Sequence, residues 1–179
     1  MNGYRQMVFA LGLLSLSGAA CALSPEDKLK AAFVYNFAKF ITWPAPDFAT
    51  QPAITVCVAG KGVMEQALAP LANRTAQGKN IVLRTGVKPE DLKGCEILFV
   101  SESEKSYPAS IAALAAANSV LTVSDRDGFA QANGMIGLSA DDSKIVFDVN
   151  LDEIEKAGLK VNAQLLRVAR TVFVQKGKR

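Results

Sequence analysis

The polar residues that follow the predicted strands are the first place to look for chemistry in this sequence. Ser124 and Asp125 come directly after the apolar residues 120–123, and α/β sheets bind ligands beyond the carboxyl ends of such strands. A catalytic serine needs a neighbouring base, but the sequence contains no histidine. We therefore interpret Ser124 and Asp125 as a turn, with a small-ligand pocket around these two residues as the alternative.

A glycine-rich stretch, Gly60-Lys61-Gly62, lies between a predicted strand and a predicted helix. Backbone amides at such a position can hold a phosphate. The stretch lacks both the Gly-Lys-Ser/Thr ending of a P-loop and the complete GxGxxG fingerprint, so we interpret it as a glycine turn.

The pair Asp141 and Asp142 fits the tip of a hairpin better than a pair of catalytic carboxylates.

The residue types also argue against a metal site, because histidine is absent and no CxxC pair is present. The sequence therefore predicts no catalytic residues, no metal ligands and no cofactor. It favours a protein that binds a partner over an enzyme. The formal net charge of +3 gives no support for binding to nucleic acid or to an anionic membrane surface.

Residues 1–22 have the pattern of a secretory signal peptide. Arg5 precedes an apolar run at residues 7–16 that is too short to span a bilayer, and small residues follow this run. Cleavage at these small residues would start the mature chain at Leu23. Lipid attachment at Cys21 is the alternative, although a glycine stands three positions earlier, where a bulky aliphatic residue is usual. We expect an exported, soluble protein in an oxidising compartment.

Two cysteines, Cys57 and Cys95, remain when Cys21 leaves with the signal peptide. Each lies in a predicted strand, and two thiols in an oxidising compartment favour a disulfide bond. Neighbouring strands of one sheet could bring the two α-carbons within bridging distance. The alternative is a pair of buried free thiols.

Helical and strand patterns alternate after the signal peptide, which predicts a single α/β domain over residues 23–179. Ser24-Pro25-Glu26-Asp27 combines a serine cap, a first-turn proline and the acid of a capping box. A helix is expected from there to about Ile41, before the Trp43-Pro44-Ala45-Pro46 turn. The other predicted helices are residues 63–71, 110–117, 151–157 and 163–174, and the predicted strands are residues 54–59, 81–85, 95–101, 120–123, 134–138 and 144–150.

This order of elements predicts the type of sheet. Short apolar strands separated by helices favour a mainly parallel sheet with helices on both faces. The last two strands, joined around Asp141 and Asp142, predict a C-terminal antiparallel hairpin at the edge of that sheet.

Several stretches of the sequence resemble the YfiR family. The most specific stretch is residues 31–44, with the sequence AAFVYNFAKFITWP. The similarity continues through residues 120–125 (VLTVSD), 134–136 (GMI), 150–151 (NL) and 164–169 (QLLRVA). In order and spacing these stretches cover nearly all of the chain after the signal peptide.

The resemblance implies a periplasmic repressor that holds an inner-membrane diguanylate cyclase inactive and so lowers cyclic di-GMP and biofilm formation. It also implies homodimerisation and an outer-membrane lipoprotein that sequesters the repressor. Some relatives carry a second cysteine pair in the C-terminal half, but this chain has no cysteine after Cys95. Only the bridge between Cys57 and Cys95 therefore carries over. The alternative function is a periplasmic module that binds a small ligand and has no cyclase partner.

The first predicted helix and the turn after it supply the expected contact residues. Trp43, Pro44 and Phe40 are our partner-binding residues, because a loop tryptophan beside prolines can anchor an interface. Asn36 lies among the phenylalanines of the helix, where an amide must find hydrogen-bond partners. We expect Asn36 to be structural and to bond to the backbone near Trp43 and Pro44.

Overall fold

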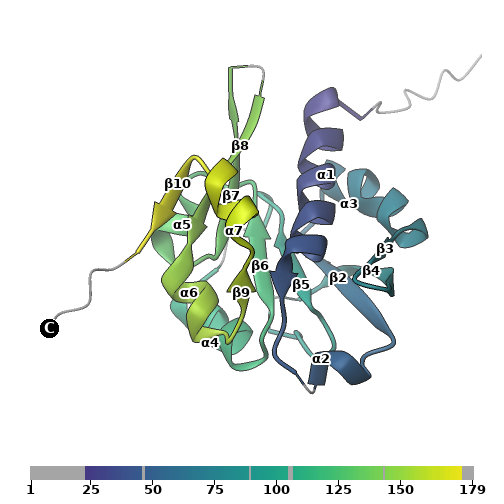
Figure 1. Ribbon diagram of the computed structural model, residues 1–179. Helices are drawn as coiled ribbons and strands as arrows, with labels where there is room; N and C mark the ends of the chain where they lie inside the picture. Colours follow the sequence, from purple (N-terminus) through teal and green to yellow (C-terminus); the bar gives the residue numbers. More distant parts are fainter. Residues whose placement is uncertain (1–22, 46, 89, 105–106, 143, 175–179) are drawn as a thin grey trace, which may run out of the picture.

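An eight-stranded sheet forms the centre of the molecule (Figure 1). The computed structural model describes residues 23–174 except residues 46, 89, 105–106 and 143, so the predicted signal peptide, with Cys21, lies outside the described residues. Within the described part of the chain, no helix has the length and apolar character needed to cross a membrane.

The sheet has the strand order β10-β8-β7-β6-β5-β2-β4-β3, and a separate pairing joins β1 to β9. The strands are β1 Ile41–Thr42, β2 Ala53–Ala59, β3 Thr75–Ala76, β4 Lys79–Val87, β5 Ile97–Val100, β6 Leu121–Ser124, β7 Ile136–Asp141, β8 Lys144–Asn150, β9 Lys160–Val161 and β10 Thr171–Phe173. The helices are α1 Pro25–Phe40, α2 Asp47–Thr50, α3 Val63–Leu68, η1 Ala69–Asn73, α4 Ala109–Ala117, α5 Phe129–Ala132, α6 Leu151–Lys156 and α7 Ala163–Val168.

The directions of the strands confirm the predicted fold class. β4, β2, β5, β6 and β7 run parallel, whereas β8 is antiparallel to β7 and forms the expected hairpin with it. β3 is also antiparallel to its neighbour, β4. The result is a mainly parallel α/β sheet with an antiparallel strand pair.

Helix α1 begins where the sequence predicts. The Ser24 hydroxyl accepts a hydrogen bond from the Asp27 backbone at 3.0 Å, and the Asp27 carboxylate accepts one from the Ser24 backbone at 3.2 Å. These reciprocal bonds satisfy two of the backbone donors that every helix start leaves open. The helix ends at Phe40, because Ile41 is already extended and pairs with Val161.

Successive residues of β2 enter two separate hydrophobic cores, one on each face of the sheet. Ile54 and Val56 pack in the core that includes buried residues of α1 and α3, whereas Cys57 and Ala59 pack in the core that includes Ala115 of α4 and Phe129 of α5. Helices therefore cover both faces, as predicted.

The aromatic residues of α1 belong largely to the interior. Phe37 is fully buried, and its ring centroid lies 5.4 Å from that of Phe147 on β8. Phe33, which is partly buried, lies 5.5 Å from the same ring. These contacts join the first helix to the hairpin near the other end of the chain, and the two stand side by side in Figure 1.

The C-terminal segment differs from the prediction of one helix over residues 163–174. Helix α7 ends at Val168, and β10 then pairs with β8 in parallel, so the hairpin is not the edge of the sheet. Two causes act here. Residues 171–174 (TVFV) favour a strand because they are β-branched or aromatic. In addition, the Arg170 backbone donates to the Phe147 carbonyl at 2.8 Å.

Smaller differences have equally local causes. The predicted helix 63–71 divides into α3 and the 3₁₀ segment η1, because Pro70 cannot donate the next helical hydrogen bond. The strands β1, β3 and β9 contain two residues each, which is too short to give a pattern in the sequence.

The ion pair between Arg170 and Asp148 holds β10 at the edge, and it gives the first testable prediction. The guanidinium donates to both carboxylate oxygens, with Nε 2.9 Å from Oδ1. These bonds hold the pKa of the Asp148 carboxyl below its ordinary value. A lowered pKa stabilises the fold above the ordinary pKa of aspartate, and this contribution is lost as the pH falls through the folded-state pKa.

We expect Asp148→Asn to lower the free energy of unfolding at neutral pH by about 1 kcal/mol, a value reduced for solvent screening because the Arg170 side chain is 42% exposed. The difference from the wild type should shrink as the pH falls below about 4. Urea unfolding of both proteins, from neutral pH to below about 4, measures this difference in the free energy of unfolding. A difference that is independent of pH would contradict this account.

Candidate functional site

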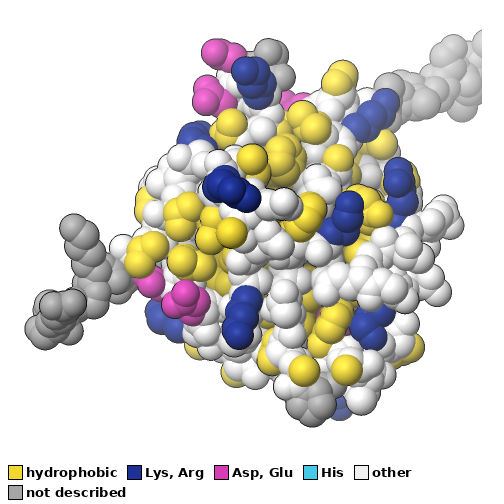
Figure 2. Space-filling view, in the orientation of Figure 1, with side chains coloured by type: hydrophobic (Ala, Val, Ile, Leu, Met, Phe, Trp, Pro, Cys, Tyr) yellow, Lys and Arg dark blue, Asp and Glu magenta, His cyan; other side chains and the backbone are white. Residues whose placement is uncertain are grey.

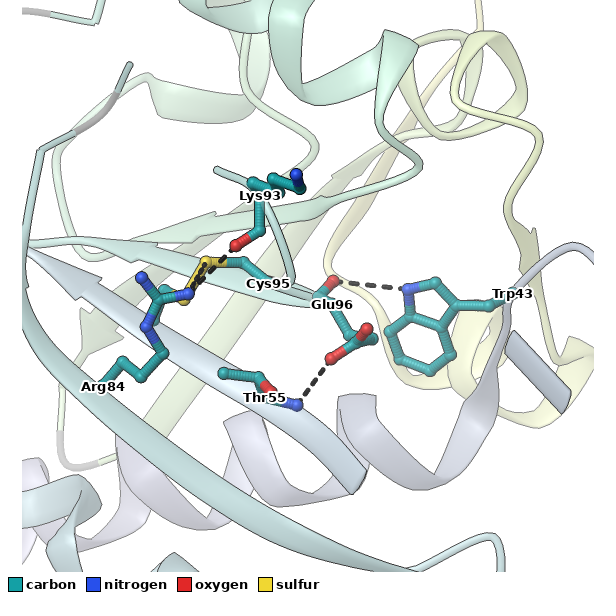
Figure 3. The surroundings of a disulfide bond; sticks show 7 residues. Trp43, Thr55, Arg84, Lys93, Cys95 and Glu96 are labelled. Carbon is teal, nitrogen blue, oxygen red and sulfur yellow. Dashed lines mark hydrogen bonds between the residues drawn. A yellow bond between two sulfur atoms is a disulfide. The ribbon is translucent and has the colours of Figure 1, made fainter. Parts of the chain in front are cut away.

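A hollow of about 270 Å³ lies at the amino ends of β2 and β5 and brings two of the predicted site groups together. Trp43 and Pro44 line it beside Cys95 of the disulfide and the neighbouring Glu96. Figure 3 shows Trp43, Cys95 and Glu96 in this region. Phe40 does not line the hollow.

Trp43 is buried, so the expectation of an accessible contact residue is wrong. Its side chain is 5% exposed, and its ring stacks on Phe48 with the centroids 5.2 Å apart. The indole Nε1 donates to the Glu96 carbonyl at 3.3 Å. The short helix α2 places Phe48 over the indole, and the buried N–H has its own partner, as buried indoles require. Pro44 and Phe40 are only partly exposed.

The predicted disulfide between Cys57 and Cys95 is present, with the α-carbons 5.8 Å apart. Both residues are buried in the core that also contains Leu98 and Ala115. Arg84 lies over the bridge (Figure 3), and its Nη1 is 3.0 Å from the Lys93 carbonyl and 3.9 Å from the Cys95 sulfur. The disulfide ties β2 to the start of β5.

Glu96 is a site residue that the sequence interpretation missed. It is 8% exposed, and its carboxylate accepts a hydrogen bond from the Thr55 backbone at 2.6 Å (Figure 3). The Glu96 backbone also donates to the Thr55 carbonyl at 3.0 Å. Burial raises the pKa of the Glu96 carboxyl, although the bond from Thr55 acts in the opposite direction. The sequence did contain a signal for this residue, because Glu96 is an acid inside the apolar run of residues 95–101.

The end of α1 is tied down by Gln77 rather than by Asn36. The Gln77 Nε2 donates to the carbonyls of Ala38 and Ile41, each at 2.8 Å. Asn36 is partly buried, and among the described residues its side chain makes no hydrogen bond to the Trp43–Pro44 turn. The amide that bonds to the end of α1 therefore belongs to a residue 39 positions after Ala38 and 36 positions after Ile41.

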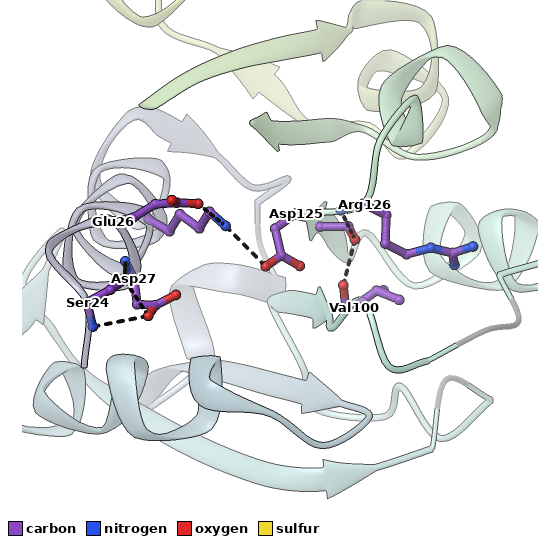
Figure 4. Close-up of polar contacts among 8 residues, drawn as sticks. Ser24, Glu26, Asp27, Val100, Asp125 and Arg126 are labelled. Carbon is purple, nitrogen blue, oxygen red and sulfur yellow. Dashed lines mark hydrogen bonds and ion pairs between the residues drawn. The ribbon is translucent and has the colours of Figure 1, made fainter. Parts of the chain in front are cut away.

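Ser124 is the last residue of strand β6, so its interpretation as part of a turn is wrong. It is fully buried, its hydroxyl donates to the Val100 carbonyl at 2.6 Å, and the same oxygen accepts the Arg126 backbone N–H at 3.1 Å (Figure 4). Both functions of the hydroxyl are thus occupied by the backbone of neighbouring segments. Ser124 is not among the residues that line the cavity beside Asp125.

Asp125, in contrast, lines a cavity of about 350 Å³ at the carboxyl ends of the parallel strands, together with Lys61 and Gly62. Its Oδ2 lies 3.5 Å from the Lys30 ammonium, which also pairs with Glu26 at 2.8 Å. The sequence had singled out Asp125 and the glycine-rich turn separately, and the fold places them at one site.

The most exposed apolar residues lie near the C-terminal end of the described chain. The described residues include five large exposed hydrophobic side chains, and three of them are Val168 (67% exposed), Val172 (36%) and Val174 (56%). Apolar side chains gather over α6, α7 and β10 on the left of Figure 2. β10 is also an edge strand of the sheet. We call Val168, Val172 and Val174 the C-terminal apolar edge.

A family model described as YfiR/HmsC-like matches residues 27–170. The comparison with curated proteins gives no match. Among the described residues, no group of three or more acidic or cysteine side chains has the arrangement that a metal ion needs.

The disulfide gives a second prediction. The sequence separation between Cys57 and Cys95 is 38 residues, and closing a loop of that length contributes about 4 kcal/mol on the chain-entropy model. The double variant Cys57→Ala/Cys95→Ala should lose about this much free energy of unfolding in urea. Each single variant should lose nearly as much as the double variant, because either change breaks the same bond. Two alkylatable thiols in the native protein, isolated without reductant, would contradict the assignment.

The amide at the end of α1 gives a third prediction. Gln77→Ala removes the side-chain donor that the carbonyls of Ala38 and Ile41 share and should cost about 1–2 kcal/mol. Asn36→Ala removes no hydrogen bond among the described residues and is the matched control, with an expected change below about 0.5 kcal/mol. Urea unfolding measures both variants, and equal losses would overturn the assignment to Gln77.

Proposed function

The chain belongs to the YfiR/HmsC-like family, and from this premise we propose that it is a periplasmic repressor of an inner-membrane diguanylate cyclase. It binds the periplasmic part of the cyclase and holds the enzyme inactive, which lowers cyclic di-GMP and biofilm formation. The family match, which extends over most of the chain, is the observation that carries this proposal. By the same resemblance, we propose that the protein forms a homodimer and is sequestered by an outer-membrane lipoprotein.

Two features of the chain support a binding role in an oxidising compartment. The disulfide between Cys57 and Cys95 suits the periplasm, where such bonds persist. Ser124 is the serine that we considered as a nucleophile in the sequence. Its hydroxyl donates a hydrogen bond to the Val100 carbonyl and accepts one from the Arg126 backbone. A hydroxyl in two backbone hydrogen bonds acts in the fold rather than in catalysis.

The C-terminal apolar edge is the surface that we propose for the cyclase. Regulatory proteins bury an exposed apolar patch when they bind a partner, and Val168 and Val174 are both more than half exposed. β10 beside them has an open side, because β8 is its only partner strand within the described part of the chain, and an edge strand can accept a further strand. Because Trp43 is buried, we propose this edge in its place as the contact surface.

The test begins with deletion of the gene in a strain that contains the membrane cyclase. We expect cellular cyclic di-GMP and surface attachment to rise, and wild-type protein supplied in trans to restore both. Val168→Glu should fail to restore them, because a carboxylate cannot be buried without a partner. An affinity loss of at least about tenfold is expected.

Val82→Glu is the matched control, since Val82 is 43% exposed on β4, at the opposite side of the sheet order. It should repress like the wild type, and both variants should accumulate and melt like the wild type. If Val168→Glu represses normally, the contact surface is wrong. If cyclic di-GMP stays unchanged in the deletion strain while the cyclase is expressed, the repressor function fails and the small-ligand-binding alternative replaces it.

A further inference from the structure

We propose that the crevice between the carboxyl ends of β2 and β5 binds a small molecule that carries a primary amine on a short apolar chain. The proposal does not rest on the cyclase function. It rests on the topology of the sheet, on the shape and lining of the cavity, and on two buried polar atoms inside it.

The position of the crevice follows from the strand order. From β2 the chain first adds β4 on one side, and it then crosses to add β5 on the other side. The order therefore reverses between β2 and β5, and their carboxyl ends point the same way because the two strands are parallel. Such a reversal separates the loops that follow the two strands and opens a crevice, where open α/β sheets bind their ligands.

A cavity of about 350 Å³ occupies this crevice, at the small end of the range for ligand sites. The loop after β2 contributes Lys61 and Gly62, and α3 contributes the side chains of Val63 and Met64 as an apolar wall. The remaining lining residues come from the loops after β5 and β6: Ser101, Glu102, Ser103 and Asp125.

The loops around the crevice are fixed to each other. The Ser103 hydroxyl accepts the Lys61 backbone N–H at 2.8 Å and donates to the Lys61 carbonyl. Gly60 has φ +82°, and a Cβ atom there would lie 2.8 Å from the Ser103 oxygen. Only glycine therefore permits this close approach between the two loops. The cavity is preformed rather than assembled by the ligand.

Two residues that line the cavity each carry a buried polar atom without a hydrogen-bond partner, the hydroxyl oxygen of Ser101 and Oδ1 of Asp125. Ser101 is only 4% exposed. Buried polar atoms are almost always paired, because an unpaired one loses its water without compensation. Four such atoms occur among the described residues, and two of them lie on residues at the sheet's ligand-binding position, whereas those of Tyr107 and Ser139 lie elsewhere. The pair at the crevice points to a bound group that supplies a hydrogen bond to each of the two atoms.

The chemistry of these atoms selects a hydrogen-bond donor. A carboxylate oxygen only accepts, and its strongest partner is a cationic donor. Lys30 lies on the other carboxylate oxygen, Oδ2, at 3.5 Å and is shared with Glu26 (Figure 4). An ammonium group can therefore occupy Oδ1 and the Ser101 hydroxyl, while a short carbon chain packs against Val63 and Met64.

The test uses n-butylamine as the probe and n-butanol as its uncharged analogue, each titrated into the ¹⁵N-labelled protein of residues 23–179. We expect n-butylamine to shift the backbone amide signals of Lys61, Gly62 and Ser101 with saturation on the order of millimolar. n-Butanol should bind at least about tenfold more weakly, because it lacks the charge. Equal affinity for the two probes would overturn the assignment to amines.

Three variants locate the site. Asp125→Asn should weaken n-butylamine binding about tenfold or more, and Asp127→Asn, an exposed acid outside the cavity lining, should leave it unchanged. Ser101→Ala should weaken binding without lowering the melting temperature, because the hydroxyl has no partner within the described protein. Wild-type affinity in both Asp125→Asn and Ser101→Ala would overturn the proposal. So would shifts that do not saturate, which would mean that the two atoms hold only water.

Discussion

The pairing of β2 with β5 is the constraint on which the rest of the structure depends. Strands are added in both directions from this pair, so an error in its register would displace every later strand. At its amino end the pair is held by the disulfide and by the two hydrogen bonds between Glu96 and Thr55. The Trp43 indole then closes over the Glu96 carbonyl. A covalent bond, a buried acid and an aromatic ring thus fix one end of one strand pair.

The two ends of this strand pair differ in how completely their polar groups are satisfied. At the amino end, the Glu96 carboxylate and the Trp43 indole both have partners inside the protein. At the carboxyl end, Ser101 and Asp125 each keep a buried atom without one. An unpaired buried group costs stability, so a fold tolerates it most readily where a ligand supplies the missing bond. The amino end of the strand pair therefore stabilises the fold, whereas the carboxyl end is available for binding a ligand.

How much could be predicted from the sequence depended on the distance between the interacting residues. The capping box at Ser24 is local, and the start of α1 was predicted correctly. The apolar runs of β2 and β5 are local patterns too, and both strands were found. The burial of Trp43, by contrast, depends on Glu96, 53 positions away. Gln77 was missed for the same reason, because contacts distant in sequence decide its role and leave no periodic signal. The strand β10 had a local signal in its β-branched and aromatic residues, which we included in the last predicted helix.

The shape of the C-terminal edge fits regulated binding better than open-ended association. Long, flat and apolar edge strands pair with one another indefinitely, and proteins prevent this with short edges and flanking charges. β10 has three residues, and Arg170 precedes it in an ion pair with Asp148. Exposed valines at Val168 and Val174 nevertheless remain on either side of the strand. An edge that is too short to propagate a sheet, yet apolar enough to bury, suits one complementary partner, as the proposed repressor function requires.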